Sequence, residues 1–290
     1  MSLDPFPVLR IAQITDSHIC PRPGLLLRET DPDTGLNDVI NGLNALNPPV
    51  DLIVHTGDLI QDEIKPSPST VHSSELKDAE ITATKTNEND VDVSYDRLRE
   101  MLSTLNAPIY CTPGNHDPKG AFRKALDGHV LMENRHLICK SWQLIMLDSN
   151  IPNSPKGHLA KNELEFLADS LSANLEPAII FMHHPPVSVK SRWLDTMMVD
   201  NAPEFFSILD NAPHTRAVIF GHIHASFECT RKGVTILGTP STAFQFKPKE
   251  PVPIVDPIDP GYRLIELNSK GGISTAVIRK SAKNVEGAQT

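Results

Sequence analysis

Short apolar runs followed by turn residues recur along the chain and predict buried β-strands. These runs are rich in Ile, Val and Leu and alternate little between apolar and polar positions, which is typical of strands buried on both faces of a sheet. The six clearest runs cover residues 8–15, 52–56, 109–112, 142–147, 178–182 and 217–220. Two shorter or more mixed runs, 234–237 and 262–267, are further strand candidates.

Apolar residues at spacings of three and four predict helices between the strands. One set runs from Leu36 to Leu46, a second from Leu98 to Leu105, and a third lies within residues 158–175. Because strands and helices alternate, we expect an α/β protein whose sheets are covered by helices.

Two segments depart from this order. Residues 63–93 are dominated by Ser, Thr, Asn, Asp, Glu and Lys and contain too little apolar surface to bury, which predicts a mobile surface insertion. Residues 75–84 within it are a marginal helix candidate, and residues 281–290 read as a frayed tail. We expect residues 1–280 to form a single domain, because 290 residues is near the upper limit for one core.

Charge and composition narrow the classes of function. The net charge of −9 argues against a protein that binds a long nucleic acid. No apolar run approaches about eighteen residues and no basic leader begins the chain, so we expect no membrane association and a cytoplasmic location. The four cysteines are widely spaced, which predicts reduced thiols rather than a metal knuckle or a redox pair.

Polar groups able to bind metal follow five of the predicted strands directly. In chain order they are Asp16 and His18, Asp58, the tetrapeptide Gly114-Asn115-His116-Asp117, His183 with His184, and His222 with His224. Because the carboxyl ends of strands line the ligand crevice of open α/β sheets, we expect these side chains to lie close together.

Each group taken alone has a structural explanation. A carboxylate can cap a turn, Gly-Asp and Gly-Asn are common turn dipeptides, and a histidine can close a strand. Only His222 and His224, two positions apart after a strand, favour a metal site by themselves. Five such groups in succession are hard to explain by packing.

The combination resembles the calcineurin-like metallophosphoesterase family, over residues 9 to 225. The matching motifs are Asp16-x-His18, Gly57-Asp58 followed by Asp62, Gly114-Asn115-His116-Asp117, His183 and Gly221-His222-x-His224. The resemblance implies a four-layer metallophosphatase sandwich, in which two mixed β-sheets are flanked by helices.

The resemblance also implies two divalent metal ions that share Asp58 as a bridging ligand. One ion would be held by Asp16, His18, Asp58 and His224, and the other by Asp58, Asn115, His183 and His222. Nitrogen and oxygen donors without a thiolate suit iron or manganese, with zinc as an alternative. Hydroxide formed on the two ions would attack phosphorus in line.

Two residues of the tetrapeptide are catalytic candidates by the same resemblance. His116 is not an expected ligand and would stabilise the phosphoryl oxygens or protonate the leaving alkoxide, while Asp117 would fix its tautomer. Asn115 and His116 would also contact substrate. The alternative for His116 is a purely structural role.

Two loops are similar to stretches in the bacterial class III cyclic AMP phosphodiesterases, namely residues 191–195 and 238–248. In these loops Arg192 could pair with phosphate, and Trp193 or Phe246 could stack on a base; the alternative for Trp193 is a packed loop anchor. The leading hypothesis is therefore hydrolysis of cyclic AMP or a related small phosphodiester to the 5′-nucleotide, with a homodimer suggested by relatives of this type.

Three other functions remain compatible with the same metal site: a phosphomonoesterase, a nucleotide pyrophosphatase and a glycerophosphodiesterase. A non-catalytic scaffold of this fold is a further alternative, but it predicts eroded ligands, and every ligand of the motif is present.

Overall fold

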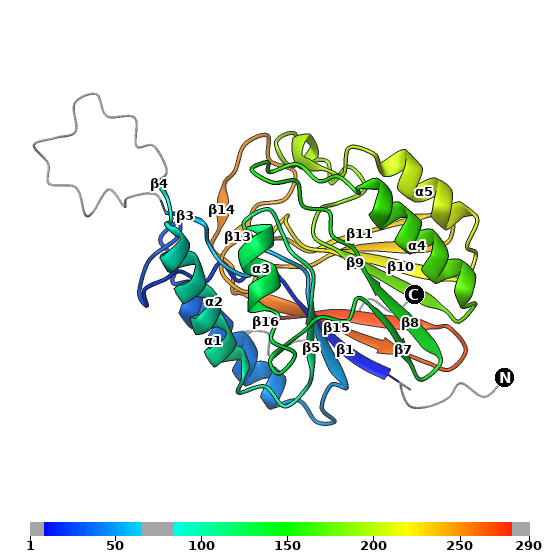
Figure 1. Cartoon of the computed structure of the whole chain (residues 1–290), viewed down its shortest axis with the longest axis horizontal. Coiled ribbons are helices and arrows are strands. Elements are labelled where there is room, and N and C mark those ends of the chain that lie inside the picture. Colours follow the sequence, from blue (N-terminus) through cyan, green and yellow to red (C-terminus); the bar gives the residue numbers. More distant parts are fainter. Residues whose placement is uncertain (1–8, 65–83, 280–290) are drawn as a thin grey trace, which may run out of the picture.

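The computed structural model describes residues 9–64 and 84–279, which form two six-stranded mixed sheets packed face to face (Figure 1). In the first sheet β1 pairs in parallel with β2, β2 with β5 and β5 with β6, while β15 and β16 add antiparallel strands on the other side. In spatial order the strands are β16 (Ile273–Arg279), β15 (Gly261–Leu267), β1 (Leu9–Ile14), β2 (Leu52–His55), β5 (Ile109–Cys111) and β6 (Leu131–Met132).

The second sheet has the same mixed character. Its central strands β8, β9, β10 and β12 are parallel, and β7 and β11 are antiparallel strands at the two edges. In spatial order the strands are β11 (Phe227–Arg231), β12 (Val234–Gly238), β10 (Thr215–Phe220), β9 (Ala178–Met182), β8 (Trp142–Met146) and β7 (His136–Cys139). Two short hairpins complete the strands: β3 (Glu63–Ile64) with β4 (Thr84–Lys85), and β13 (Gln245–Phe246) with β14 (Val255–Asp256).

Helices cover the outer face of each sheet. The first sheet packs against α1 (Pro32–Asn44), α2 (Glu88–Leu102) and α3 (Lys119–Ala125), and the second against α4 (Lys161–Ala173) and α5 (Ala202–Asp210). The side chains of Asp31 and Asn87 cap α1 and α2 by accepting backbone N–H groups of the first turn. A 3-10 turn, η2 (Leu194–Met197), precedes α5.

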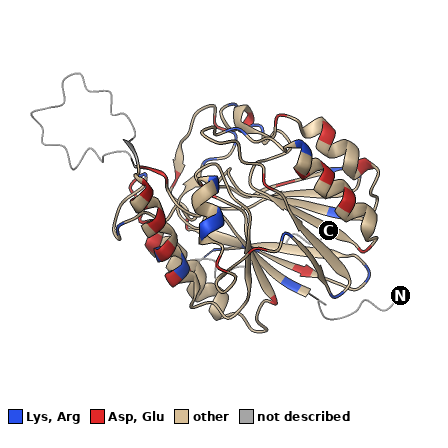
Figure 2. Cartoon of the chain, viewed as in Figure 1, with Lys and Arg blue, Asp and Glu red and all other residues tan. Residues whose placement is uncertain are grey.

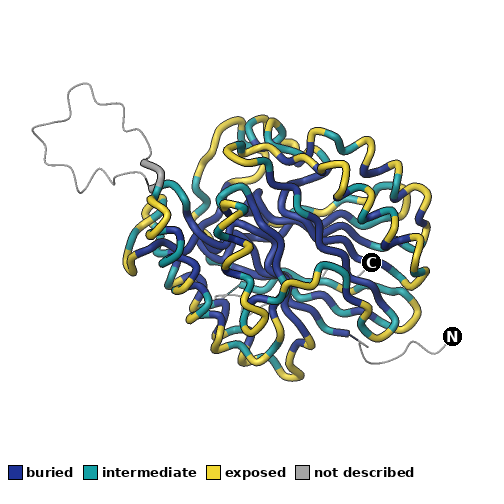
Figure 3. The backbone as a smooth tube through the Cα atoms, viewed as in Figure 1, coloured by how far each residue is buried: buried dark blue, intermediate teal, exposed yellow. Residues whose placement is uncertain are grey.

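The hydrophobic core has three layers, which follow from this arrangement (Figure 3). One lies between the first sheet and its helices, one between the second sheet and its helices, and one between the two sheets. The layer between the sheets contains the fully buried Trp142 and Phe181. The predicted four-layer α/β sandwich is therefore confirmed, and all four cysteines are free thiols as predicted.

All eight predicted strands are present, with ends that shift by at most two residues. The strands that sequence patterns missed lie mostly at sheet edges: β11 and β16 are only half buried, so they lack the continuous apolar run of a central strand. Two helices, α3 and α5, were also missed, because seven and nine residues are too short to show a helical period.

The predicted insertion at 63–93 has to be corrected at its C-terminal end. Residues 88–93 are not part of a surface loop but form the first turns of α2, where Val91 is buried. The apolar spacing that predicts this helix begins only at Val91, so the polar residues before it looked like part of the loop. The helix candidate at 75–84 and the predicted tail at 281–290 lie largely or wholly outside the described residues.

Acidic residues are frequent on α2, α4 and α5 (Figure 2). No helix within residues 9–64 and 84–279 is long and apolar enough to cross a membrane.

Candidate metal centre

The donor side chains predicted from the sequence meet where the two sheets bring their parallel strands to an end. Asp16 and His18 follow β1, Asp58 follows β2 and Asn115 follows β5 in the first sheet, while His183 follows β9 and the pair His222 and His224 follows β10 in the second. All are buried except Asn115, which is half buried. The site therefore lies across the junction of the two sheets.

Four of these residues form a first group, site A. His18 Nε2 lies 3.2 Å from His224 Nε2, and His224 Nε2 lies 3.3 Å from Asp16 Oδ1. Asp58 Oδ2 lies 3.8 Å from His18 Nε2 and completes the group.

A second group, site B, shares Asp58 with the first. His183 Nε2 lies 3.1 Å from Asn115 Oδ1, 3.2 Å from His222 Nδ1 and 3.4 Å from Asp58 Oδ2. The same carboxylate oxygen, Asp58 Oδ2, thus faces the nitrogen donors of both sites.

The spacing and orientation of the donors fit metal ions. With metal–ligand bonds of about 2.1 Å, neighbouring ligand atoms lie roughly 3.0–3.4 Å apart, and most of the distances in sites A and B fall in this range. His183 Nδ1 donates to Thr56 O, and His224 Nδ1 donates to Phe244 O, both at 2.8 Å. These bonds keep the proton of the neutral ring on Nδ1, so that each Nε2, which faces the site, is the atom that would bind a metal ion.

Electrostatics also favour cations here. Asp16 and Asp58 are buried, and within the described part of the chain their ion-pair partners are histidines alone. Burial raises the pKa of Asp58, but His183 and His116 outweigh it and hold that pKa well below its usual value. Burial lowers the pKa of His18 to about 3, and that of His222 likewise to about 3, so both rings are neutral and available as ligands.

Five of the donor residues have a backbone conformation that side chains rarely adopt. Their φ angles are positive, at 54° for Asp16, 47° for His18, 51° for Asp58, 65° for His222 and 49° for His224. Such left-handed residues are uncommon outside glycine and cluster at functional sites, where the surrounding structure holds them in place.

Glycines beside the ligands permit this close approach. A Cβ on Gly114 would overlap the carboxylate and the backbone nitrogen of Asp58, and a Cβ on Gly221 would overlap the hydroxyl of Thr15 and lie 2.8 Å from an Asp16 carboxylate oxygen. These glycines are needed for space rather than for flexibility.

The partner of His116 differs from the sequence prediction. His116 Nδ1 lies 2.6 Å from Asp62 Oδ1, and its backbone N–H donates to Asp58 Oδ1 at 2.8 Å. Burial by itself lowers the pKa of His116, but the carboxylates of Asp58 and Asp62 outweigh it and raise that pKa to about 9. Asp62, rather than Asp117, is placed to fix the tautomer of this ring.

Asp117 has a different task, which corrects its predicted catalytic role. Its carboxylate accepts hydrogen bonds from Tyr95 Oη at 2.8 Å, Gly114 N at 2.8 Å and Leu59 N at 3.1 Å. Burial, followed by the charge of Asp58, raises the pKa of Asp117 to about 7. It therefore ties the loop after β5 to the loop after β2 and to α2. Its two neighbours in the tetrapeptide, Asn115 and His116, face the site instead.

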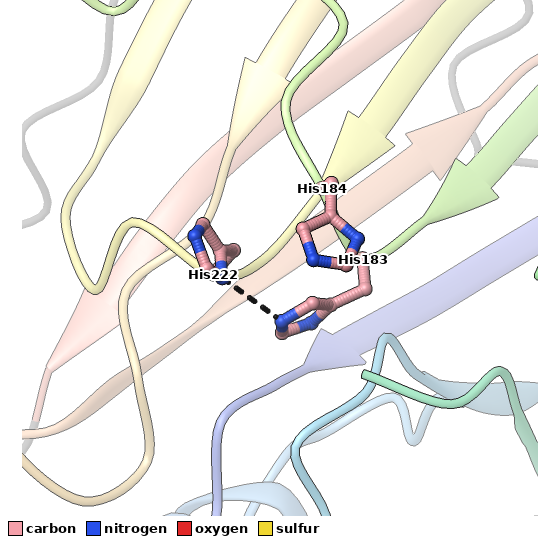
Figure 4. A group of neighbouring side chains, drawn as sticks. All are labelled: His183, His184 and His222. Carbon is pink, nitrogen blue, oxygen red and sulfur yellow. Dashed lines mark hydrogen bonds between the residues drawn. The ribbon is translucent and has the colours of Figure 1, made fainter. Parts of the chain in front are cut away.

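A further histidine, His184, packs beside site B (Figure 4). Its ring centroid lies 4.8 Å from that of His183 and 4.9 Å from that of His222. His184 Nδ1 lies 2.8 Å from Ser149 Oγ. Burial, with the neighbouring His183 and His222, holds the pKa of His184 well below its usual value, so the ring is a neutral support for the two site B histidines.

Three of the predicted substrate contacts, Arg192, Trp193 and Phe246, lie in the loops at 191–195 and 238–248. Phe246 is buried, with its ring centroid 5.0 Å from that of His224, and Trp193 packs edge-on against it at 4.9 Å. This geometry favours packing behind site A over stacking on a base. Arg192 is exposed. None of these three residues lines the cavity that opens beside His116.

A cavity of about 790 Å³ opens beside His116. It is bounded by the tetrapeptide, by α3, by the start of α2 and by the loop at 150–155. This volume is within the usual range for small-molecule sites. The cavity is therefore large enough for a leaving group bound next to His116.

The fold and the donor set are those of a metal-dependent phosphoesterase. The chain belongs to the calcineurin-like phosphoesterase family, whose model matches residues 9–226. That span includes every donor of sites A and B.

Curated relatives match along nearly the whole chain. A 3′,5′-cyclic adenosine monophosphate phosphodiesterase, CpdA, of Escherichia coli strain K12 is 31% identical over 93% of this chain and 90% of its own length. A 3′,5′-cyclic-nucleotide phosphodiesterase of Nostoc sp. is 30% identical over 93% of this chain and 92% of its own. Among solved structures, a dimetal phosphatase from Danio rerio superposes with a TM-score of 0.67 at 12% identity, covering 98% of this chain and 100% of its own.

The close contact between Gly114 and Asp58 leaves no room for a Cβ, and this can be tested. Gly114→Ala should displace the Asp58 carboxylate and lower the affinity for divalent metal by at least about tenfold, as other changes to groups that orient metal ligands do. Metal content after dialysis against graded chelator measures this loss.

Gly42→Ala is the matched control, because a Cβ on Gly42 meets only the Tyr262 ring at an ordinary 3.6 Å. That variant should bind metal like the unchanged protein. Retention of full metal affinity by Gly114→Ala would show that the close contact with Asp58 is unimportant.

Proposed function

We propose that the protein is a dinuclear-metal phosphodiesterase that hydrolyses 3′,5′-cyclic nucleotides, cyclic AMP first, to 5′-nucleotides. The observation that carries this proposal is the position of Asp58, whose Oδ2 faces His18 in site A and His183 in site B. A carboxylate between two sets of imidazole nitrogen donors is the arrangement that a pair of bridged ions requires.

In this proposal each ion has four protein ligands. Site A uses Asp16, His18, Asp58 and His224, and site B uses Asp58, Asn115, His183 and His222. The donors are imidazole, carboxylate and amide groups, which favour iron or manganese, with zinc as the alternative, over calcium or magnesium. Such ions, when bound, supply Lewis acidity toward the phosphoryl oxygens and a water of lowered pKa as nucleophile.

The chain's own groups would do the remaining work. Asn115 and His116 are the half-buried members of the site: Asn115 contacts His183 of site B, and the His116 ring centroid lies 5.1 Å from that of His18 in site A. A phosphoryl group would enter between them. With its Nδ1 held by Asp62, the His116 ring presents Nε2 for donation to the leaving oxygen, and Asp62 stabilises the protonated ring. His116 thus acts as a general acid rather than as a ligand.

The choice of a cyclic nucleotide rests on the relatives and on charge. The relatives that match nearly the whole chain are named for 3′,5′-cyclic nucleotides. A small monoanionic diester needs positive charge only at the phosphate, which two metal ions provide within a protein of net charge −9.

A substrate panel tests the proposal directly. The manganese-loaded protein should hydrolyse cyclic AMP with a higher kcat/KM than 5′-AMP, p-nitrophenyl phosphate, glycerophosphodiesters or dinucleotide pyrophosphates. Product analysis by chromatography should show 5′-AMP. A clear preference for any phosphate monoester, or no turnover of cyclic nucleotides, would contradict the assignment.

The His116–Asp62 pair generates a second prediction. His116→Ala should lower kcat/KM about a hundredfold or more for cyclic AMP, whose leaving alkoxide needs a proton, but much less for a p-nitrophenyl diester, whose leaving phenolate does not. Asp62→Asn should change both rates in the same sense and to a smaller extent.

His129, which is exposed and does not line the cavity, serves as the control. His129→Ala should leave both rates unchanged. Equal losses on the two substrates in His116→Ala would rule out proton donation to the leaving group.

A further inference from the structure

The cavity beside His116 contains a buried amide group that neither the metal sites nor the general acid uses. Asn150 lies in the loop between β8 and α4, is 6% exposed, and lines the cavity together with Asn115 and His116. Its backbone is held in place, because its N–H donates to Asp148 Oδ1 and it forms an isolated bridge with Gly157.

The orientation of this amide is fixed by its partner. Asn150 Nδ2 donates to the backbone oxygen of Asp117 at 2.9 Å. Because a carbonyl oxygen can only accept, the nitrogen must face Asp117 and the oxygen must face away. Asn150 Oδ1 is a buried acceptor without a hydrogen-bond partner among the residues that the structure describes.

An acceptor without a partner in the cavity wall indicates that a bound ligand supplies the hydrogen-bond donor. A buried polar atom without a partner costs about 1–3 kcal/mol, and such groups need an explanation in a folded protein. The Asn150 amide donates a hydrogen bond to the backbone oxygen of Asp117, the residue that follows His116. A ligand atom that pairs with Asn150 would therefore lie close to the group that His116 protonates.

The charges around the cavity indicate which part of a ligand it accepts. Its lining contains five carboxyl side chains and two lysines. Both lysines are engaged, Lys119 with Asp148 at 3.2 Å and Lys124 with Asp92 at 2.5 Å. A second phosphate would be repelled here, whereas a neutral part with hydroxyl donors would be accepted.

We propose that Asn150 is a specificity residue, whose Oδ1 accepts a hydrogen bond from the ribose 2′-hydroxyl of the cyclic nucleotide. This inference rests on the proposed function. In a 3′,5′-cyclic nucleotide the leaving oxygen is O3′, and the 2′-hydroxyl is on the next carbon of the ring. With O3′ at His116, the 2′-hydroxyl is the donor nearest to Asn150, and the nucleoside fills the cavity.

The test compares cyclic AMP with 2′-deoxyadenosine 3′,5′-cyclic monophosphate in the manganese-loaded protein. The unchanged protein should prefer cyclic AMP about ten- to a hundredfold in kcat/KM, because the deoxy substrate leaves the Asn150 acceptor unpaired. In Asn150→Ala that preference should fall to within about threefold of unity. Because each preference is a ratio within one variant, a smaller folded fraction cancels.

Two further variants separate the hydrogen bond from a structural effect. Asn150→Asp keeps an acceptor oxygen and should retain the preference for the 2′-hydroxyl, even if it turns over more slowly. Asn211→Ala removes an exposed amide at the end of α5, outside the lining of the cavity, and should also retain it.

Different results would refute the role of Asn150 and the proposed function. If the unchanged protein hydrolyses both substrates equally well, or if Asn150→Ala lowers both rates and keeps the preference, the role of Asn150 is refuted while the phosphodiesterase stands. If neither cyclic nucleotide is hydrolysed, the proposed function is refuted and the inference with it.

Discussion

The burial of two carboxylates without a lysine or arginine beside them, within the described residues, is the constraint on which the site depends. Removing an ionised carboxylate from water costs several kcal/mol unless opposite charge compensates. Asp16 and Asp58 are 0% and 2% exposed, and their ion-pair partners among the described residues are histidines. Burial lowers the pKa of His183, but Asp58 outweighs it and raises that pKa to about 9, so a protonated His183 can offset part of this charge. Cations held between the donors would offset it instead. The metal ions of the proposal are therefore part of the stability of this region as well as of its chemistry.

The rest of the fold brings the donors to this point and keeps them there. Two sheets supply parallel strands whose ends meet, and apolar layers on both sides of each sheet hold those ends in register. The strand ends then turn through left-handed residues, an arrangement costing of order 1–3 kcal/mol per residue. Asp117 and Tyr95 connect two of the turns through buried hydrogen bonds. The packed sheets and these hydrogen bonds together hold the strained ligand residues in place.

Much of this could be predicted from the sequence, because central strands and metal ligands leave strong local signals. Continuous apolar runs marked the buried strands, and the ligand types directly after them predicted one shared site. What the sequence could not show depends on side-chain direction across loops. Asp62 and Asp117 are both acidic neighbours of the motif, and only the fold shows that Asp62 reaches His116 while Asp117 turns inward. Asn150 gave no signal, because an asparagine in a loop is usually a turn residue.

In the proposed metal centre one carboxylate, Asp58, joins two metal ions. The most direct test of this arrangement is a crystal structure of manganese-loaded protein with anomalous scattering measured at the metal edge, for the unchanged chain and for Asp58→Ala. Two anomalous peaks are expected in the unchanged chain, one among the donors of site A and one among those of site B, with the Asp58 carboxylate between them. At least one peak should be lost in the variant. A single peak in the fully loaded protein, or two undiminished peaks without Asp58, would contradict it.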